Sequence, residues 1–427
     1  MYAINEKLLE RENSGNPVGV ALIGCGQMGT DIIATIARMK GMRLAAVVDL
    51  SDEGIRRSLK TADYSRKTLF TESSTEAAKA GMECTVCSTN WRTAVSLRST
   101  DVVIDATGSP EMGAVISMAC IDLKKHIIMM NVECDVTVGP LLRRMADNAG
   151  VVYGMGAGDE PAAIMELYRF AVAAGFTVVA AGKGKNNPLD LYATPGTLAQ
   201  KAAARNMSTS MLCEFVDGSK TAIEMAAVSN ATGLVPDVRG MHGAKSVVAD
   251  LHKVFCPKKD GGVLNQSGVV DFAIGVHPGV FLVVTTDSAR LRDSLIQRDM
   301  GNGPNYCLFR PFHLCSIEVP LSAAQTVIYG ESSGHPQYHL TSECITIAKR
   351  DLKAGEVLDG IGGNCYRVSI DHYAVAKNEN LLPAGLAKGC VLTKNVNKDE
   401  PIANDVVQVI KDSVLRQVRK LQESLYG

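Results

Sequence analysis

The motif Gly24-x-Gly26-x-x-Gly29 constrains the fold of this chain more than any other feature. An apolar run, Val18 to Ile23, precedes it, and isoleucines recur at helical spacing after it, which predicts a strand, a tight turn and a helix. In such a unit the first glycine permits the turn, the second lets a pyrophosphate approach the backbone, and the third lets helix and strand pack closely. A second apolar run ends at Asp49, where the residue that binds an adenosine ribose is expected. The sequence therefore predicts a Rossmann domain, a doubly wound parallel sheet that binds a dinucleotide.

Two later strands end in polar residues that belong to the same predicted site. Asp101 to Ala106 is followed by Thr107 and Gly108, and His126 to Met130 is followed by Asn131. Loops at the carboxyl ends of parallel strands face the cofactor in doubly wound sheets. We expect the dinucleotide to contact Gly24, Gly26, Gln27, Met28, Gly29, Asp49, Thr107, Gly108 and Asn131.

The sequence leaves the choice between NAD and NADP open. A 2′-phosphate about 4 Å from Asp49 would cost up to ~4 kcal/mol at an effective dielectric constant near 20, which favours NAD. Arg56 and Arg57 begin the next segment, and they would neutralise such a phosphate if they turned toward it. A solvated helix face is an equally good interpretation of the two arginines.

Composition and charge limit the classes of protein to which this chain can belong. The chain has 427 residues, a formal net charge of -1 and mixed charges along its length, so nothing in it favours nucleic acid or an acidic membrane as a partner. No apolar run approaches the ~18 residues that a membrane span needs. Its twelve cysteines are scattered, and the first residues are too charged for a signal peptide. We expect a cytoplasmic protein with a small-molecule substrate.

The stretch VVAAGKGKNNPLD, residues 178–190, is the main candidate for the substrate site. Its apolar run, Val178 to Ala181, ends in a predicted turn with Lys183 and Lys185, followed by Asn186 and Asp190. The lysines suit a phosphate or a carbonyl oxygen, the asparagine a hydroxyl, and the aspartate a metal ion or a proton. A solvated turn is the alternative.

A predicted helix, Lys220 to Asn230, supplies further candidates. Lys220 and Glu224 lie one turn apart on it. Most of its other residues are apolar, so a charged side chain on this helix is less easily explained as an ordinary solvent-exposed residue. An ordinary surface pair is the alternative. His242, in a polar loop beyond this helix, completes the predicted catalytic set.

From Glu343 the composition changes to short β-type runs separated by turns. The segments AKRDLKAGEVLDG and KGCVLTKNVNKDEPI resemble a SAF domain, a small β-rich module, and residues 404–426 have the periodicity of a terminal helix. The predicted fold is therefore α/β, with a Rossmann domain (1–160), an α+β substrate domain whose end returns to the Rossmann domain (161–335), and a SAF-like domain with a C-terminal helix (336–427).

Together with GKGKNNPLD and EFVDGSKTAIEM, this order of domains resembles the deoxyxylulose-phosphate-reductoisomerase-like (DRL) enzymes, a group within the homoserine-dehydrogenase-like NAD(P) oxidoreductases. The resemblance implies a homo-oligomer, expected to be a dimer. It also implies that 1-deoxy-D-xylulose 5-phosphate, a phosphorylated sugar, is rearranged with Mg²⁺ or Mn²⁺ and reduced by NADPH to 2-C-methyl-D-erythritol 4-phosphate. Glu133, Asp190 and Glu224 are the candidate metal ligands.

Two other functions remain open. One is a plain NAD(P)-dependent dehydrogenase of a polyol, a sugar acid or another small hydroxy compound, which needs no metal. The other is a non-catalytic protein that senses a nucleotide. The aspartate-rich substrate loop of homoserine dehydrogenases is not recognisable in this sequence, which counts against homoserine itself.

Overall fold

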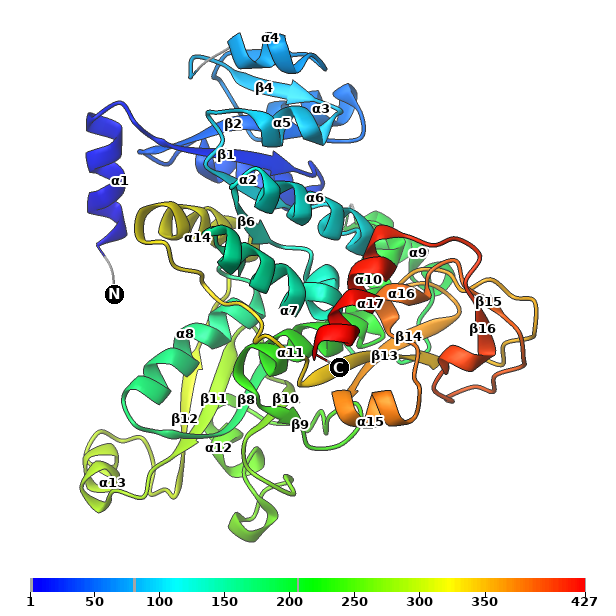
Figure 1. Cartoon of the computed structure of the whole chain (residues 1–427). Coiled ribbons are helices and arrows are strands. Elements are labelled where there is room, and N and C mark those ends of the chain that lie inside the picture. The colour runs from blue at the N-terminus through cyan, green and yellow to red at the C-terminus, as the bar shows by residue number, and fades with distance from the viewer. Residues whose placement is uncertain (1–2, 80–81, 206, 427) are drawn as a thin grey trace. The chain divides into compact units, whose positions relative to one another are not determined.

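The structure, a computed structural model, describes residues 3–79, 82–205 and 207–426 (Figure 1). The chain divides into two compact units. Unit 1 comprises Met1–Ala162 and Leu314–Tyr338, and unit 2 comprises Ala163–His313 and His339–Gly427. The three-domain division at residues 160 and 335 stays a prediction.

Unit 1 is built on a parallel sheet of seven strands in the order β3-β4-β2-β1-β5-β6-β7. The strands are β1 (Val18–Ile23), β2 (Met42–Val48), β3 (Thr68–Phe70), β4 (Thr85–Ser88), β5 (Val102–Asp105), β6 (His126–Met129) and β7 (Tyr153–Met155). The chain builds outward from β1 to one side and then crosses to β5 on the other, which makes the carboxyl ends of β1 and β5 the switch point where doubly wound sheets bind ligands. The predicted Rossmann fold is confirmed.

Helices cover this sheet in the usual alternation of strand and helix. They are α1 (Ile4–Asn13), α2 (Gln27–Ile36), α3 (Asp52–Thr61), α4 (Ser74–Lys79), α5 (Trp91–Ser96), α6 (Pro110–Asp122), α7 (Val132–Ala149) and, after the chain returns from unit 2, α14 (Cys315–Tyr329).

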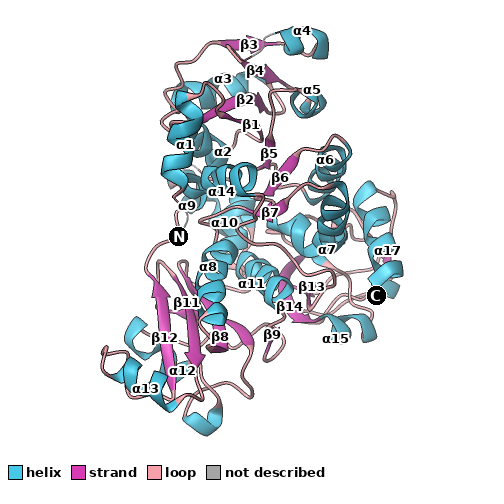
Figure 2. Ribbon diagram, turned by 60° about the vertical axis from the view of Figure 1, so that its left-hand side comes forward, coloured by secondary structure: helices cyan, strands magenta, loops and turns pink. Residues whose placement is uncertain are grey.

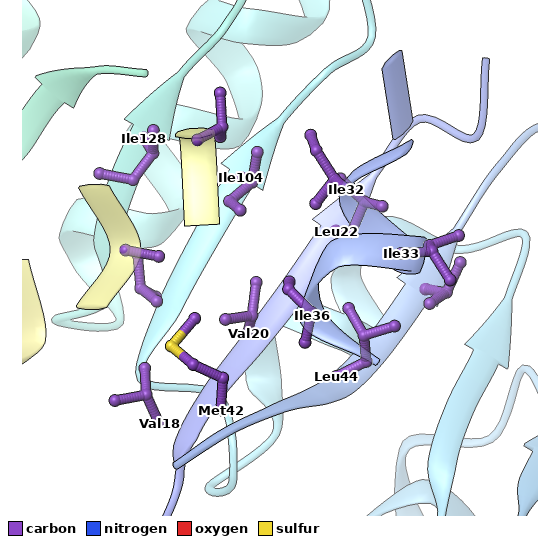
Figure 3. Close-up of a cluster of buried hydrophobic side chains, with 14 of the residues drawn as sticks. Val18, Val20, Leu22, Ile32, Ile33, Ile36, Met42, Leu44, Ile104 and Ile128 are labelled. Atoms are coloured by element: carbon purple, nitrogen blue, oxygen red, sulfur yellow. The ribbon is translucent and has the colours of Figure 1, made fainter. Parts of the chain in front are cut away.

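The core of unit 1 lies between α2 and the central strands (Figure 3). Ile32, Ile33 and Ile36 of α2 are buried against the side chains of β1 and β2, as their spacing predicts. Val319 and Ala323 of α14 join the same cluster. A fully buried aliphatic side chain contributes about 1.5–3 kcal/mol. This packing fixes the position at which α2 begins, and therefore the glycine-rich turn in front of it.

Unit 2 holds a mixed sheet of five strands in the order β12-β11-β8-β10-β9. Figure 2 shows β12, β11 and β8 of this sheet side by side. The strands are β8 (Thr177–Lys185), β9 (Val235–Pro236), β10 (Val269–Ile274), β11 (Val280–Thr285) and β12 (Asn305–Arg310). Strand β8 runs parallel to β10 and antiparallel to β11. The helices of this part are α8 (Glu160–Ala173), which begins at the boundary of the units, α9 (Pro195–Ala204), α10 (Thr209–Val216), α11 (Ser219–Thr232), α12 (Leu251–Val254) and α13 (Ala289–Ile296), with 3₁₀ turns η1 (Val248–Asp250) and η2 (Lys258–Asp260).

The predicted turn at Lys183 and Lys185 is wrong, because β8 continues through both lysines. Gly182 pairs with Phe281 of β11, and Lys185 pairs with Ile274 of β10. A Cβ atom on Gly184 would overlap the carbonyl oxygen of Val276, so this position accepts only glycine. The glycines that suggested a turn instead permit close contact within the sheet.

The C-terminal part of unit 2 contains two small antiparallel sheets and several short helices. Its elements are β13 (Ser342–Ala348), β14 (Tyr366–His372), α15 (Tyr373–Asn378), α16 (Ala384–Ala387), β15 (Val391–Leu392), η3 (Asn404–Val406), β16 (Val407–Gln408) and α17 (Val414–Tyr426). The terminal helix begins at Val414 and not at residue 404, because Val407 pairs with β15 and the Ser413 hydroxyl accepts a hydrogen bond from the Arg416 amide. The SAF assignment stays a prediction.

The β13–β14 hairpin covers α11. The Asn230 side chain accepts hydrogen bonds from the amides of Thr341 and Ser342, and the Ser219 hydroxyl accepts one from Val368. Because α11 also packs on β10 and β8, nearly all of its residues are buried. The C-terminal segment therefore determines the surroundings of the one carboxylate on this helix, Glu224.

None of the helices within the described residues is long and apolar enough to span a lipid bilayer.

Candidate functional site

The glycine-rich turn has the geometry of a dinucleotide site. Gly24 adopts φ +108°, and a Cβ atom there would lie 2.5 Å from the carbonyl oxygen of Ala106. A Cβ on Gly29 would overlap the carbonyl oxygen of Gly24, whereas one on Gly26 would meet nothing within 4 Å. Gly24 and Gly29 are therefore required by the fold, and Gly26 leaves open space in front of the first turn of α2, where Gln27 and Met28 lie. Such a turn presents its amide groups to an anion.

Asp49 follows β2 beside this turn. One of its carboxylate oxygens accepts a hydrogen bond from the Cys25 amide at 2.7 Å, and the other accepts one from the Leu50 amide at 2.6 Å. Asp49 thus braces the glycine-rich turn in addition to its expected contact with a ribose. The Arg56 guanidinium stacks on Phe70, 3.6 Å from the ring centre.

The loops after β5 and β6 are linked through Asn131. Its side-chain amide donates to the Ser109 carbonyl oxygen at 2.7 Å and to Asp105 at 3.3 Å, and its oxygen accepts from the Cys134 amide at the start of α7. Asn131 is almost fully buried, so it positions the loop that carries Thr107 and Gly108. Burial raises the pKa of Asp105. Glu133, in the first turn of α7, is also buried.

Lys183 and Lys185 lie two residues apart in β8, so they project from the same face of the sheet. Only 6% and 5% of their surfaces are exposed, which rules out the solvated turn. The Lys183 ammonium group forms an ion pair with the Glu224 carboxylate of α11. The Lys185 ammonium group donates to the carbonyl oxygen of Phe215, in the last turn of α10, at 2.7 Å. Helix carboxyl ends favour cations, so α10 supports this position.

Lys185 differs from an ordinary surface lysine in acidity. Burial, with a smaller contribution from the neighbouring Lys183 charge, lowers the pKa of Lys185 to about 8. The Glu224 and Asp217 carboxylates oppose this shift. A lysine with such a pKa holds a proton at neutral pH and releases it readily, which suits a general acid.

Other predicted catalytic residues lie on neighbouring segments. Lys220 is half-buried one turn before Glu224 on α11. Asn186 and Asp190 are exposed in the loop after β8, where the Asp190 carboxylate accepts from the Tyr192 amide. This hydrogen bond within the loop therefore occupies one carboxylate oxygen of Asp190.

His242 lies in the loop after β9. Its ring Nε2 lies 2.7 Å from a carboxylate oxygen of Asp237, and its backbone amide donates to Asp271. Asp237 thus braces the His242 ring within this loop.

Sequence reasoning missed Lys349 as part of this neighbourhood. Its ammonium group donates to the carbonyl oxygens of Ala193 and Gly363 at 2.7 Å and lies 2.8 Å from Asp217. Asp217 in turn accepts from the Ser219 amide at the start of α11. Nothing in the local spacing signals this, because the contact joins distant parts of the chain. Lys349 fixes the junction of α10 and α11, which carry the partners of Lys185 and Lys183.

Carboxylate oxygens are the ligands that Mg²⁺ and Mn²⁺ prefer. In unit 2, Glu224 is a buried carboxylate next to the lysines. In unit 1, Asp159 and Glu160 are buried at the start of α8, and Glu133 is buried in α7. Asp190 is exposed and fits this role less well.

Two family models match this chain. Residues 24–154 match the model described as homoserine dehydrogenase, NAD binding domain, and residues 158–319 match the one described as oxidoreductase DRL, catalytic domain. No curated protein matches significantly.

Solved structures are similar to parts of the chain at low identity. An NAD binding oxidoreductase from Klebsiella pneumoniae is 17% identical, with a TM-score of 0.30, over 42% of this chain and 45% of that one. A probable dehydrogenase from Thermotoga maritima is 13% identical, with a TM-score of 0.39, over 74% of this chain and 90% of that one. The chain thus spans less than half the length of the Klebsiella protein that it matches.

The matched models define the class of protein: this chain is an oxidoreductase that uses a nicotinamide dinucleotide. The non-catalytic alternative is thereby set aside. More particularly, its middle part is similar to the catalytic domain of DRL oxidoreductases, and that part contains every catalytic residue predicted from the sequence. The resemblance is confirmed for these two domains, whereas its SAF part stays a prediction.

Proposed function

We propose that this protein is a reductoisomerase that converts 1-deoxy-D-xylulose 5-phosphate to 2-C-methyl-D-erythritol 4-phosphate. The observation that carries the proposal is the pair of buried lysines on one face of β8, inside the segment that matches the DRL catalytic domain. Burial lowers the pKa of the Lys185 ammonium group, and the Lys183 ammonium group is paired with the Glu224 carboxylate. A phosphorylated hydroxy-ketone needs both cationic contacts and a proton donor.

The chemistry assigns a role to each side chain. A nicotinamide cofactor, when bound, supplies a hydride to the carbonyl carbon of the rearranged intermediate. The carbonyl oxygen then becomes an alkoxide, and the Lys185 ammonium group gives it a proton. The Lys183 ammonium group, held by Glu224, polarises the carbonyl oxygen or binds the phosphate of the substrate. Asn186 and Lys220 orient the hydroxyl groups.

A divalent metal ion belongs to this proposal, because a chelated hydroxy-ketone rearranges more readily than a free one. Each unit has buried carboxylates with the chemistry of ligands for such an ion: Glu224 in unit 2, and Asp159, Glu160 and Glu133 in unit 1. Plain hydride transfer needs no such ion. The second candidate function is therefore a metal-independent dehydrogenase of a polyol, sugar acid or other small hydroxy compound.

Asp49 supports NAD(H) over NADP(H). Its carboxylate lies beside the glycine-rich turn, where it would face a 2′-phosphate on the ribose, and Arg56 is engaged with Phe70. The resemblance to reductoisomerases, in contrast, favours NADPH. Comparing the two reduced cofactors in wild type and in Asp49→Ala decides between them: if Asp49 repels a 2′-phosphate, the variant gains about tenfold or more in relative affinity for NADPH.

The test of the function is an absorbance assay at the nicotinamide band. Deoxyxylulose phosphate is offered with each reduced cofactor, with and without Mg²⁺ or Mn²⁺, and Lys185→Ala serves as the control. Cofactor oxidation that depends on both the metal and the substrate supports the reductoisomerase. Oxidation of cofactor without metal, by other carbonyl compounds only, supports the dehydrogenase instead.

Assembly and location are proposals of the same kind. We propose a homodimer in the cytoplasm. The structure records all twelve cysteines as free thiols, in keeping with a reducing compartment. Sedimentation of the purified protein tests the dimer.

A further inference from the structure

A cavity of about 460 Å³ lies in unit 1 at the edge of the sheet where β1 and β2 begin. Pro17, Met42, Arg43 and Leu44 line it, together with Tyr64 and Arg66. The glycine-rich turn lies at the other end of β1. Six residues of extended strand separate the two ends, a distance of about 20 Å. The cavity is therefore distinct from the dinucleotide site.

The lining of this cavity is cationic. Arg38, Lys40, Arg43 and Arg66 all contribute to it, against a single acidic residue, Glu12. The Glu12 carboxylate already accepts a hydrogen bond from the Gly41 amide at 2.7 Å. Arg38 is also engaged, since it donates to the carbonyl oxygen of Ala34.

Arg43 is the most unusual member of this group. Its side chain is 3% exposed, and its Nη2 donates to the carbonyl oxygen of Ser99 at 3.0 Å, whereas its Nε and Nη1 have no hydrogen-bond partner. Burial lowers the pKa of Arg43, and the nearby charge of Arg66 lowers it further, with Asp101 opposing both. A buried guanidinium with unpaired donors is costly to the fold, so a negative charge close to it would stabilise it.

We propose that this cavity binds a small phosphate-bearing anion through Arg43, Arg66 and Lys40. The planar fork of an arginine matches phosphate oxygens in a two-bond geometry, and an ammonium group adds a point charge. Nε and Nη1 of Arg43 are themselves shielded from solvent, so Arg43 would act on the anion through its positive charge, and the anion would offset the repulsion between the two arginines. The site thus serves a ligand other than the cofactor and the substrate of the oxidoreductase.

Calorimetric titration of the full-length protein with inorganic phosphate, pyrophosphate and citrate tests this site. Saturating reduced dinucleotide is present throughout, so that the glycine-rich turn is already occupied. We expect wild type to bind pyrophosphate, and Arg66→Ala to weaken binding at least about tenfold. Arg98→Ala removes an exposed arginine that is outside the lining and serves as the matched control, with unchanged affinity.

Arg43→Met is the second variant, since it replaces the buried cation by an apolar side chain of similar length. It is expected to abolish pyrophosphate binding while the dinucleotide still binds. If Arg43→Met fails to fold, the double variant Arg66→Ala/Lys40→Ala takes its place, because both of its residues are exposed. The proposal is overturned if wild type binds neither phosphate nor pyrophosphate, if citrate binds and the phosphates do not, or if Arg66→Ala binds as tightly as wild type.

Discussion

The Lys183 ammonium group and the Glu224 carboxylate form an ion pair with less than a tenth of either side chain exposed. Strand β8 supplies the cation and α11 the anion, and the C-terminal hairpin covers the helix from its other side. Such a pair is hard to form, because both charges lose their hydration. The pair lies in the segment that matches the DRL catalytic domain, and this position supports the functional role that we propose for it.

Removing one member of this pair should destabilise unit 2 strongly. Glu224→Ala leaves the Lys183 charge without its carboxylate, and Lys183→Met leaves the Glu224 charge without its ammonium group. Each single change is expected to lower the free energy of unfolding by about 3–5 kcal/mol. The double variant should recover much of this loss and remain inactive. Urea unfolding followed by circular dichroism measures the free energy of unfolding of each variant. Additive losses of that free energy in the double variant would contradict the pairing.

Lys185→Ala is expected to abolish turnover while leaving dinucleotide affinity intact. The change removes the proposed proton donor from unit 2, whereas the glycine-rich turn and Asp49 belong to unit 1. Stopped-flow or steady-state assays give the rate, and fluorescence of the bound reduced cofactor gives the affinity. Unchanged steady-state rates with the correct substrate would reject the role of Lys185.

The pH dependence of the reduction follows from the same residue. The Lys185 pKa lies near 8, so its ammonium form predominates below that pH and disappears above it. If Lys185 donates the proton, kcat/KM for carbonyl reduction is flat below about pH 8 and falls tenfold per pH unit above it. In Lys185→Arg this fall should vanish from the profile, because arginine does not titrate there.

The same shift predicts a change in stability. Between pH 8 and the ordinary lysine pKa of 10.5, the unfolded chain binds the proton that the folded chain has released. Stability therefore rises with pH over this window as far as Lys185 is concerned. A Lys185→Met variant, measured beside wild type, should lose this rise, and an identical slope in both proteins would show that other groups cause it.

Short-range patterns made the first unit predictable from the sequence. The strand Val18–Ile23, the turn and the buried face of α2 depend on residues that are neighbours in the chain, so spacing alone placed Gly24, Gly29 and Asp49. Even there, the bracing role of Asp49 toward Cys25 was not visible, because it arises from the fold of the turn in space.

The second unit was harder because its site depends on long-range contacts. The glycines around Lys183 suggested a turn, and only pairing with β10 and β11 makes this segment a strand. The periodicity of residues 404–426 suggested one helix, but the pairing of Val407 with β15 interrupts it. Lys349 had no local signal at all.

Gly26→Ala should separate cofactor binding from folding. A methyl group at Gly26 meets no protein atom within 4 Å, but it fills the space where a pyrophosphate approaches the turn. We expect a melting temperature close to that of wild type and a dinucleotide affinity at least about tenfold weaker. Gly24→Ala is the matched control, because its φ of +108° and its contact with Ala106 predict a loss of stability as well. Normal affinity in Gly26→Ala would mean that the cofactor does not lie over this turn.

Lys349→Met should destabilise unit 2 without a direct effect on unit 1. The ammonium group and the Asp217 carboxylate are almost completely buried, so the change leaves an uncompensated charge and two carbonyl oxygens without their donor. The expected loss is about 3–5 kcal/mol, and Lys349→Met/Asp217→Asn should recover part of it.

Trp91, the single tryptophan of the chain, lies in unit 1, so its fluorescence reports that unit, while circular dichroism reports both. We therefore expect an earlier transition in circular dichroism than in tryptophan fluorescence. Coincident transitions, or a variant as stable as wild type, would contradict a local role for Lys349 at the junction of α10 and α11.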